Sequence, residues 1–126
     1  MNKCHNRKVK TRDGIEHTSI KESRRWNELL LLQRAGQIKD LKRQVKFELI
    51  PAQREQGTIG KRGGIKQGKL IERELSYIAD FVYIDTKTGQ MVVEDAKGYK
   101  GGTIYALFVF KRKLMLYVHN IQVKEI

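Results

Sequence analysis

The sequence has little cysteine and proline and no long hydrophobic run. Its 126 residues include a single cysteine, Cys4, and a single proline, Pro51. A lone cysteine cannot form an internal disulfide, and the three histidines do not recur with it at a zinc-ligand spacing. No apolar run approaches the roughly 20 residues that a membrane-spanning helix needs, and the basic N-terminus has no hydrophobic signal segment. We therefore expect a reduced cytoplasmic protein without structural metal and without a membrane partner.

Positive charge is in large excess. Lys and Arg number 26 against 14 Asp and Glu, which gives a net charge of +12. The excess is concentrated toward the front, because residues 1–50 carry 13 basic and 6 acidic side chains. Such a balance indicates a polyanionic partner, since Lys and Arg that neutralise phosphates release counterions. Nucleic acid is the favoured partner, and an acidic protein or the ribosome is the alternative.

Hydrophobic periodicity predicts an α/β protein. In two segments apolar side chains recur at helical spacing, which predicts helices. In four other segments they alternate with polar side chains or run continuously, which predicts strands. In chain order we expect a helix over 19–35 that ends at Gly36, strands over 44–50 and 77–84, a turn over 85–89, a strand over 91–97, a helix over 103–117 and a strand over 121–124. This order predicts one domain over 1–126, with a mixed central sheet flanked by helices.

Two basic segments lack the apolar residues of a core. Residues 1–17 are expected to form a flexible basic arm. Residues 51–75 contain five glycines and six basic residues and are expected to form a loop or protrusion. Within this loop Gly63, Gly68 and Lys69 fit part of a phosphate-binding loop, but Leu70 stands where Ser or Thr must reach Mg²⁺. We therefore expect no nucleotide cofactor.

A cluster of charged residues lies on the two expected central strands. Alternation over 91–97 places Asp95 and Lys97 on one face and Glu94 on the other. Asp80 lies on a face of the preceding strand that is otherwise apolar, where an unpaired carboxylate costs several kcal/mol. If the strands pair about the turn, Asp80 and Asp95 come close together, and two hard oxygen ligands beside a lysine describe a Mg²⁺ or Mn²⁺ phosphodiester site. A buried Asp80–Lys97 ion pair is the alternative, and a β-bulge would exchange Glu94 and Asp95.

Two further residues have competing interpretations. Glu22 completes a capping box with Ser19, yet helical spacing places it in the core-facing stripe, where a metal ligand is the stronger interpretation. Lys111 falls within the apolar stripe of the second helix. It is either a lysine whose stem packs on the core or a cation that reaches the scissile phosphate.

The charged cluster also resembles a known signature. Asp80, fourteen residues and then Asp95-Ala96-Lys97 resemble the PD-(D/E)XK nuclease motif, although Ala79 stands in place of the proline. From about Asp13 to the C-terminus the chain resembles a family of small phage-encoded proteins akin to Holliday junction resolvases. The blocks that carry this resemblance begin at Ser19, Leu32, Gln44, Tyr77, Val93 and Lys111.

The resemblance implies a role for each matching residue. Asp80, Asp95 and the carbonyl of Ala96 would bind the divalent ion, which is Mg²⁺ with Mn²⁺ able to substitute. Glu22 would complete the shell of this ion or hold a second one. Lys97 would activate the attacking water and offset the charge of the phosphate. Gln44 matches a recurrent glutamine and would contact the water or the phosphate.

The fold implied is a restriction-endonuclease-like core, and the activity implied is Mg²⁺-dependent endodeoxyribonuclease action on branched DNA. A phage Holliday junction resolvase in the bacterial cytoplasm is the leading interpretation, and two symmetric nicks would require a homodimer. The alternatives are a flap, single-strand or nonspecific nuclease of phage replication or recombination, and a non-catalytic DNA-binding accessory protein. The residues expected to contact DNA are Arg7, Lys8, Lys10, Arg12, Arg24, Arg25, Lys61, Arg62, Lys66, Lys69 and Lys111.

Overall fold

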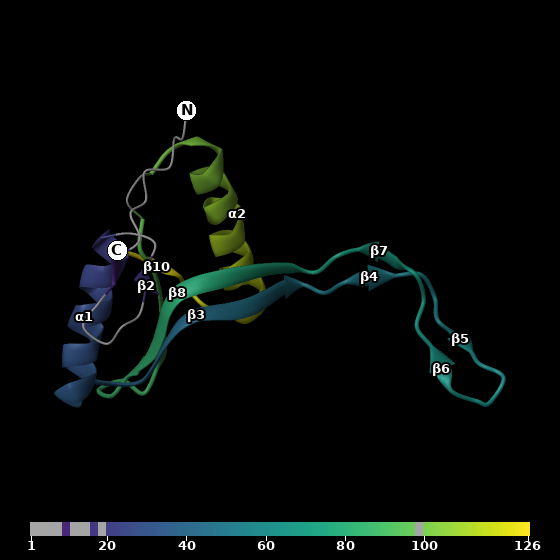
Figure 1. The fold of residues 1–126 in the computed structure, drawn as a ribbon, viewed down its shortest axis with the longest axis horizontal. Coiled ribbons are helices and arrows are strands. Elements are labelled where there is room, and N and C mark those ends of the chain that lie inside the picture. Colours follow the sequence, from purple (N-terminus) through teal and green to yellow (C-terminus); the bar gives the residue numbers. More distant parts are fainter. Residues whose placement is uncertain (1–8, 11–15, 18–19, 98–99) are drawn as a thin grey trace.

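The protein is a mixed β-sheet with two helices and a long two-stranded arm (Figure 1). This structure is a computed structural model that describes residues 9–10, 16–17, 20–97 and 100–126. The sheet has the order β10-β9-β8-β3, with β10 parallel to β9 and the other neighbours antiparallel. Its strands are β3 (Ile38–Ile50), β8 (Leu75–Asp85), β9 (Met91–Asp95) and β10 (Lys124–Glu125). The predicted α/β class and mixed sheet are confirmed.

The two helices lie close to where the sequence predicts them. Helix α1 spans Ile20–Arg34, one residue shorter at each end than predicted. Helix α2 spans Gly102–His119, one residue longer at its start and two residues longer at its end than predicted. Gly36 follows α1 with φ 79°, a left-handed conformation that suits glycine at a helix C-terminus. Ser19, the predicted cap of α1, lies outside the described residues. No helix of the described part of the chain is long and apolar enough to cross a membrane.

Strand boundaries differ more from the prediction. Strand β3 begins at Ile38, six residues before the predicted start, and the last strand pairs only over Lys124–Glu125 rather than over 121–124. Strands β8 and β9 form a hairpin whose turn ends at Gly89, where the N–H bonds the carbonyl of Asp85 and φ is 72°. This hairpin pairs Phe81 with Glu94.

The helices pack on opposite faces of the sheet through separate apolar clusters. At β9, Val93 packs in the cluster that includes α2, whereas the adjacent Glu94 faces Arg25 of α1. The α2 cluster contains Leu49, Tyr77, Ala79, Val82, Val93, Phe108, Met115 and Val123. The α1 cluster contains Trp26, Leu29, Ile38, Phe81 and Tyr83.

The clusters show that side-chain alternation reverses within β8. Tyr77 and Ala79 pack in the α2 cluster, yet Phe81 and Tyr83 pack in the α1 cluster. Strict alternation over 77–84 predicts from the sequence that these four side chains share one face, and this prediction is wrong. On the neighbouring strand β3, Gln44 has φ 53°, a left-handed conformation that is rare for a residue other than glycine. The side-chain alternation changes at this point in both strands. It places polar side chains between the part of the sheet that packs on α2 and the part that packs on α1.

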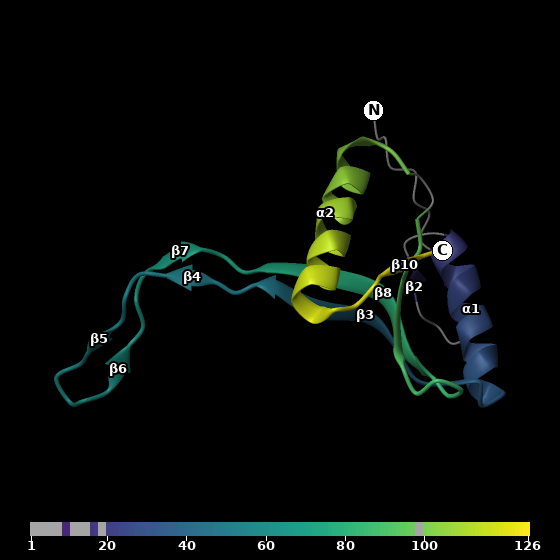
Figure 2. The same cartoon turned by 180° about the vertical axis from the view of Figure 1, so that it is seen from behind.

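Residues 51–75 form the arm, which projects from the ends of β3 and β8 (Figures 1 and 2). Its four short strands pair as two successive ribbons, β4 with β7 and β5 with β6. They are β4 (Gln53–Arg54), β5 (Thr58–Ile59), β6 (Ile65–Lys66) and β7 (Leu70–Glu72). Near the N-terminus β1 (Val9–Lys10) pairs antiparallel with β2 (Glu16–His17). Most of the predicted basic arm over 1–17 lies outside the described residues.

Candidate functional site

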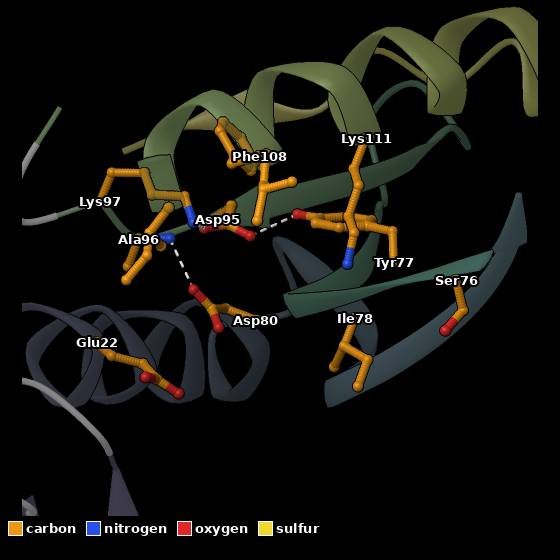
Figure 3. A pocket seen from close by; sticks show the side chains of 12 residues that line it. Glu22, Ser76, Tyr77, Ile78, Asp80, Asp95, Ala96, Lys97, Phe108 and Lys111 are labelled. Carbon is orange, nitrogen blue, oxygen red and sulfur yellow. Dashed lines mark hydrogen bonds and ion pairs between the residues drawn. The ribbon is translucent and has the colours of Figure 1, made fainter. Parts of the chain in front are cut away.

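A pocket of about 440 Å³ lies between α1, the β8–β9 hairpin and α2 (Figure 3). Charged and aromatic side chains from all of these elements reach it. Its lining residues are Glu22, Ser76, Tyr77, Ile78, Asp80, Asp95, Ala96, Lys97, Ile104, Leu107, Phe108 and Lys111. The predicted site residues Glu22, Asp80, Asp95, Ala96, Lys97 and Lys111 are all among them. The fold therefore brings together residues that are up to 89 positions apart in the chain.

Asp95 ends β9 inside the pocket, where only 3% of its surface is exposed. Its Oδ1 lies 2.8 Å from the Nζ of Lys97, and its Oδ2 accepts a hydrogen bond of 2.5 Å from the hydroxyl of Tyr77. The Lys97 ammonium also lies 4.1 Å from the centre of the Phe108 ring, a cation–π contact. Both Asp95 oxygens and the Lys97 ammonium are thus fixed in position by β8, β9 and α2.

Asp80 projects from β8 toward the end of β9 (Figure 3). Its Oδ2 accepts a hydrogen bond of 2.8 Å from the backbone N–H of Ala96. Burial, followed by the negative charge of Asp95, raises the pKa of Asp80 from 3.8 to about 7, and Glu22 contributes in the same direction. The Ala96 N–H and Lys97 oppose this rise without cancelling it. Asp80 is therefore a buried carboxyl group whose ionised form is disfavoured by burial and by neighbouring negative charge.

Gln44 connects Asp80 to Glu22. It lies opposite Asp80 in the register that pairs β3 with β8. Its Nε2 is 3.3 Å from Oε1 of Glu22 and 3.4 Å from Oδ1 of Asp80. Glu22 is 2% exposed, and its Oε1 lies 4.0 Å from the Arg43 guanidinium. The strained backbone of Gln44 thus positions an amide between two carboxylates from different elements.

Glu94 lies on the other face of β9 from Asp95. It is completely buried and accepts two hydrogen bonds of 2.8 Å from Nε and Nη2 of Arg25, which is 23% exposed. Tyr83 donates its hydroxyl to the same carboxylate. Since β9 has no bulge at this point, Glu94 and Asp95 do not exchange roles. Glu94 joins α1 to the sheet, and Asp95 faces the pocket.

The donors of the pocket fit a divalent cation in type and charge. Glu22, Asp80 and Asp95 supply hard carboxylate oxygens, which Mg²⁺ and Mn²⁺ prefer. Burial first, and then the negative charges of Asp95 and Glu22, raise the pKa of Asp80, and an added cation would favour its ionised form against both effects. Among the described residues, however, no three His, Cys, Asp or Glu side chains converge as a formed metal cluster. Polar groups of Gln44, Ala96, Tyr77 and Lys97 contact both oxygens of Asp80, both oxygens of Asp95 and one oxygen of Glu22.

Other predicted residues lie in several places. Lys111 extends from α2 into the pocket, whereas Arg24 is exposed on α1 away from it. Arg25, predicted to contact DNA, instead has its guanidinium directed to Glu94 and Glu28. The arm carries the exposed cations Lys61, Arg62, Lys66 and Lys69. Arg7, Lys8 and Arg12 lie outside the described residues, and Lys10 is described only as part of β1.

Tyr77 is the site residue that the sequence prediction missed. Strict alternation places it on the face opposite Asp80, so its hydroxyl gave no reason to include it. The reversal within β8 brings that hydroxyl to Asp95, and burial beside this carboxylate raises the pKa of Tyr77. The only signal in the sequence is a phenol within a largely apolar strand.

The raised pKa of Asp80 predicts how stability depends on pH. Because the folded protein holds the Asp80 proton more tightly than the unfolded chain does, its stability falls as the pH rises from about 4 to about 7. Asp80→Asn removes this loss, so in chelator at pH 8 we expect the variant to be more stable than the wild type by roughly 2–4 kcal/mol. The difference should vanish near pH 4. Urea denaturation at both pH values measures it, and a variant less stable at pH 8 would contradict the predicted sign.

The profile of a family described as "Protein of unknown function (DUF1064)" matches residues 1–125. No curated protein and no solved structure matches the chain. The family match includes every residue that lines the pocket.

Proposed function

We propose that this chain, which belongs to the DUF1064 family of proteins of unknown function, is a divalent-metal-dependent endodeoxyribonuclease with a restriction-endonuclease-like core. One observation carries the proposal: Asp80, Asp95, Lys97 and Glu22 line the same pocket. Buried carboxylates beside a lysine suit phosphodiester hydrolysis, in which negative charge develops on the phosphate. The net charge of +12 supports a polyanionic substrate.

Each pocket residue has a chemical task in this proposal. Asp80, Asp95 and Glu22 would hold Mg²⁺ or Mn²⁺, with the carbonyl of Ala96 as a further ligand. The bound ion supplies positive charge that stabilises the phosphate in the transition state and lowers the pKa of a nearby water. Lys97, held between Asp95 and the Phe108 ring, places an ammonium where it orients a water and neutralises a phosphate oxygen. The Gln44 amide contacts the carboxylates of both Asp80 and Glu22 and would hold them in position relative to each other.

Cations in the pocket and along the arm support DNA as the substrate. Lys111 reaches the pocket from α2 (Figure 3), and in this proposal its ammonium would contact the scissile phosphate. Lys61, Arg62, Lys66 and Lys69 lie on the arm, which continues the strands that carry Gln44 and Asp80. A DNA molecule long enough to contact both Lys111 and the arm would be held in a defined position relative to the pocket carboxylates.

Branched DNA is the substrate class that we propose, with a Holliday junction of phage recombination as the leading candidate. The arm supports this choice, because it suits the open centre of a branch better than the uniform surface of a duplex. Resolution of a junction requires two symmetric nicks, and each small chain has one pocket, so we propose a C2 homodimer.

Cleavage of four labelled DNA substrates tests the proposal. A four-way junction, a flap, a single strand and a linear duplex are each incubated with Mg²⁺, with Mn²⁺ or with chelator. We expect paired nicks in the junction that require the metal and that disappear in Asp80→Asn. Metal-dependent cleavage of the other substrates would retain the nuclease and change its biological role. Cleavage that persists in Asp80→Asn would contradict the assignment of the pocket.

A non-catalytic DNA-binding protein is the second candidate, and one observation favours it. Lys97 and Tyr77 occupy both oxygens of Asp95, as expected if the charged cluster only stabilises the fold. In that case the protein would bind the junction tightly and would cut no DNA with either metal. The measurable effect of Asp95→Asn would then be a loss of stability. The nuclease is preferred because Asp80 and Glu22 add negative charge that a structural ion pair does not need.

A further inference from the structure

The arm is a defined ribbon rather than a loose loop. Two glycines allow its two chain segments to pass close to each other between the paired parts. A Cβ atom on Gly68 would lie 1.8 Å from the carbonyl oxygen of Glu55, and one on Gly57 would lie 2.8 Å from that of Lys66. The Glu55 N–H bonds the carbonyl of Lys69 at 2.8 Å beside this crossing. The two chain segments of the arm therefore stay in backbone contact between its two paired parts, and its tip projects away from the sheet (Figure 2).

Charge is divided along the arm. Its distal half, residues 56–69, contains the four exposed cations Lys61, Arg62, Lys66 and Lys69 and no acidic residue. The acidic residues of the arm are Glu55, Glu72 and Glu74, all nearer the sheet. The tip thus has positive charge without acidic residues of its own to balance it, which suits contact with phosphates.

Two isoleucines lie at the same tip. Ile59 and Ile65 are paired directly across the β5–β6 ribbon, so both side chains lie on the same face. They are 80% and 90% exposed, among the most exposed of the large apolar residues that the structure describes. An apolar pair between cations is the chemistry of side chains that insert between DNA bases while nearby cations hold the phosphates.

We propose that Ile59 and Ile65 form a wedge that inserts between the bases of bound DNA and unstacks them. The inference rests on the proposed function, since it takes DNA as the ligand, and it adds how the protein selects its substrate. Unstacking costs least where bases are already unpaired or the duplex is easily kinked, as at a branch point. The wedge therefore favours branched DNA over a regular duplex. An anionic membrane would also attract cations and isoleucines, but the arm continues the strands that carry Gln44 and Asp80, which points to the pocket's own substrate.

Fluorescence of 2-aminopurine placed at the centre of a four-way junction tests the wedge, since this base brightens when it unstacks. The measurement uses full-length protein in Ca²⁺, so that binding is observed without dependence on cleavage. We expect the wild type to raise the fluorescence severalfold and the double variant Ile59→Ser, Ile65→Ser to abolish the rise and weaken binding about tenfold. Ile71→Ser is the matched control, because Ile71 is 60% exposed but lies in β7 at the arm's base.

The wedge and the cations are separated by the dependence of binding on salt. Lys61→Ser with Arg62→Ser should lower the salt slope by about 2, whereas the isoleucine variant should leave the slope unchanged. An unchanged fluorescence rise in the isoleucine variant overturns the wedge. The wedge is also overturned if the only defect of the isoleucine variant is weaker binding to vesicles of phosphatidylserine and phosphatidylcholine, or weaker self-association measured by light scattering. Cleavage measured in parallel distinguishes the two proposals: a wedge without cleavage contradicts the nuclease, and cleavage without a wedge contradicts this inference.

Discussion

Replacing Asp95 by Asn is expected to reduce the rate of DNA cleavage by at least about a thousandfold. The substitution keeps the shape of the side chain but removes the charge that fixes Lys97 and that would hold the cation. An amide oxygen can still accept the hydrogen bond from Tyr77, and the partly exposed Lys97 can turn its ammonium to water, so the protein should lose some stability and still fold. DNA binding should be unchanged or slightly tighter, because the variant has one negative charge fewer near the phosphate.

Single-turnover cleavage with Mg²⁺ measures the rate, and fluorescence anisotropy in Ca²⁺ measures binding. Tyr77→Phe is a useful comparison, because it removes the hydroxyl that contacts Asp95 and leaves the charge in place. We expect this variant to keep most of the activity. If Asp95→Asn cleaves within tenfold of the wild-type rate, Asp95 has no catalytic part.

Glu94→Gln, at the adjacent residue, is expected to have the opposite effect. It leaves the Arg25 guanidinium beside a neutral amide, and removing one partner of such a buried pair costs about 3–5 kcal/mol. Since Arg25 is 23% exposed and can be partly hydrated, we expect about 2–4 kcal/mol. Urea denaturation measures this loss. Cleavage per folded molecule should remain within about threefold of the wild type, because Glu94 does not line the pocket.

A second variant tests the reason for this loss. Replacing both partners, by Arg25→Met with Glu94→Leu, removes the unpaired charge and should recover part of the stability. A stable but inactive Glu94→Gln protein would show that Glu94, rather than Asp95, belongs to the active site. The two adjacent substitutions thus separate a catalytic carboxylate from a structural one.

Sequence periodicity was sufficient for the elements that hold the pocket. Strict alternation on β9 correctly placed Asp95 with Lys97 and Glu94 on the other face, because this strand is regular. The tight turn after Asp85 then fixed the pairing that brings Asp80 near the end of β9. Local patterns and a short turn were enough here, since both are set by neighbouring residues.

The same reasoning failed where the backbone is irregular. Alternation predicted one face for Tyr77, Ala79, Phe81 and Tyr83, but the order reverses beside Gln44, whose positive φ no propensity indicates. The contact between Tyr77 and Asp95 depends on this reversal. Arg25 was likewise predicted to contact DNA, whereas its guanidinium binds Glu94. This partner is 69 positions away in the sequence, so no local pattern indicates the pairing. Such pairings are set by tertiary packing and leave no local signal.

The most direct test of the account is calorimetric titration of the protein with Mn²⁺ in the absence of DNA. The account predicts a binding heat in the wild type that is lost in Asp80→Asn and retained in Glu94→Gln. Of these two residues, Asp80 lines the pocket and Glu94 does not. Electron paramagnetic resonance of free Mn²⁺ can measure the same binding if the heat is small. Equal Mn²⁺ binding by the wild type and Asp80→Asn, or none by either, would contradict the claim that these carboxylates hold a divalent cation.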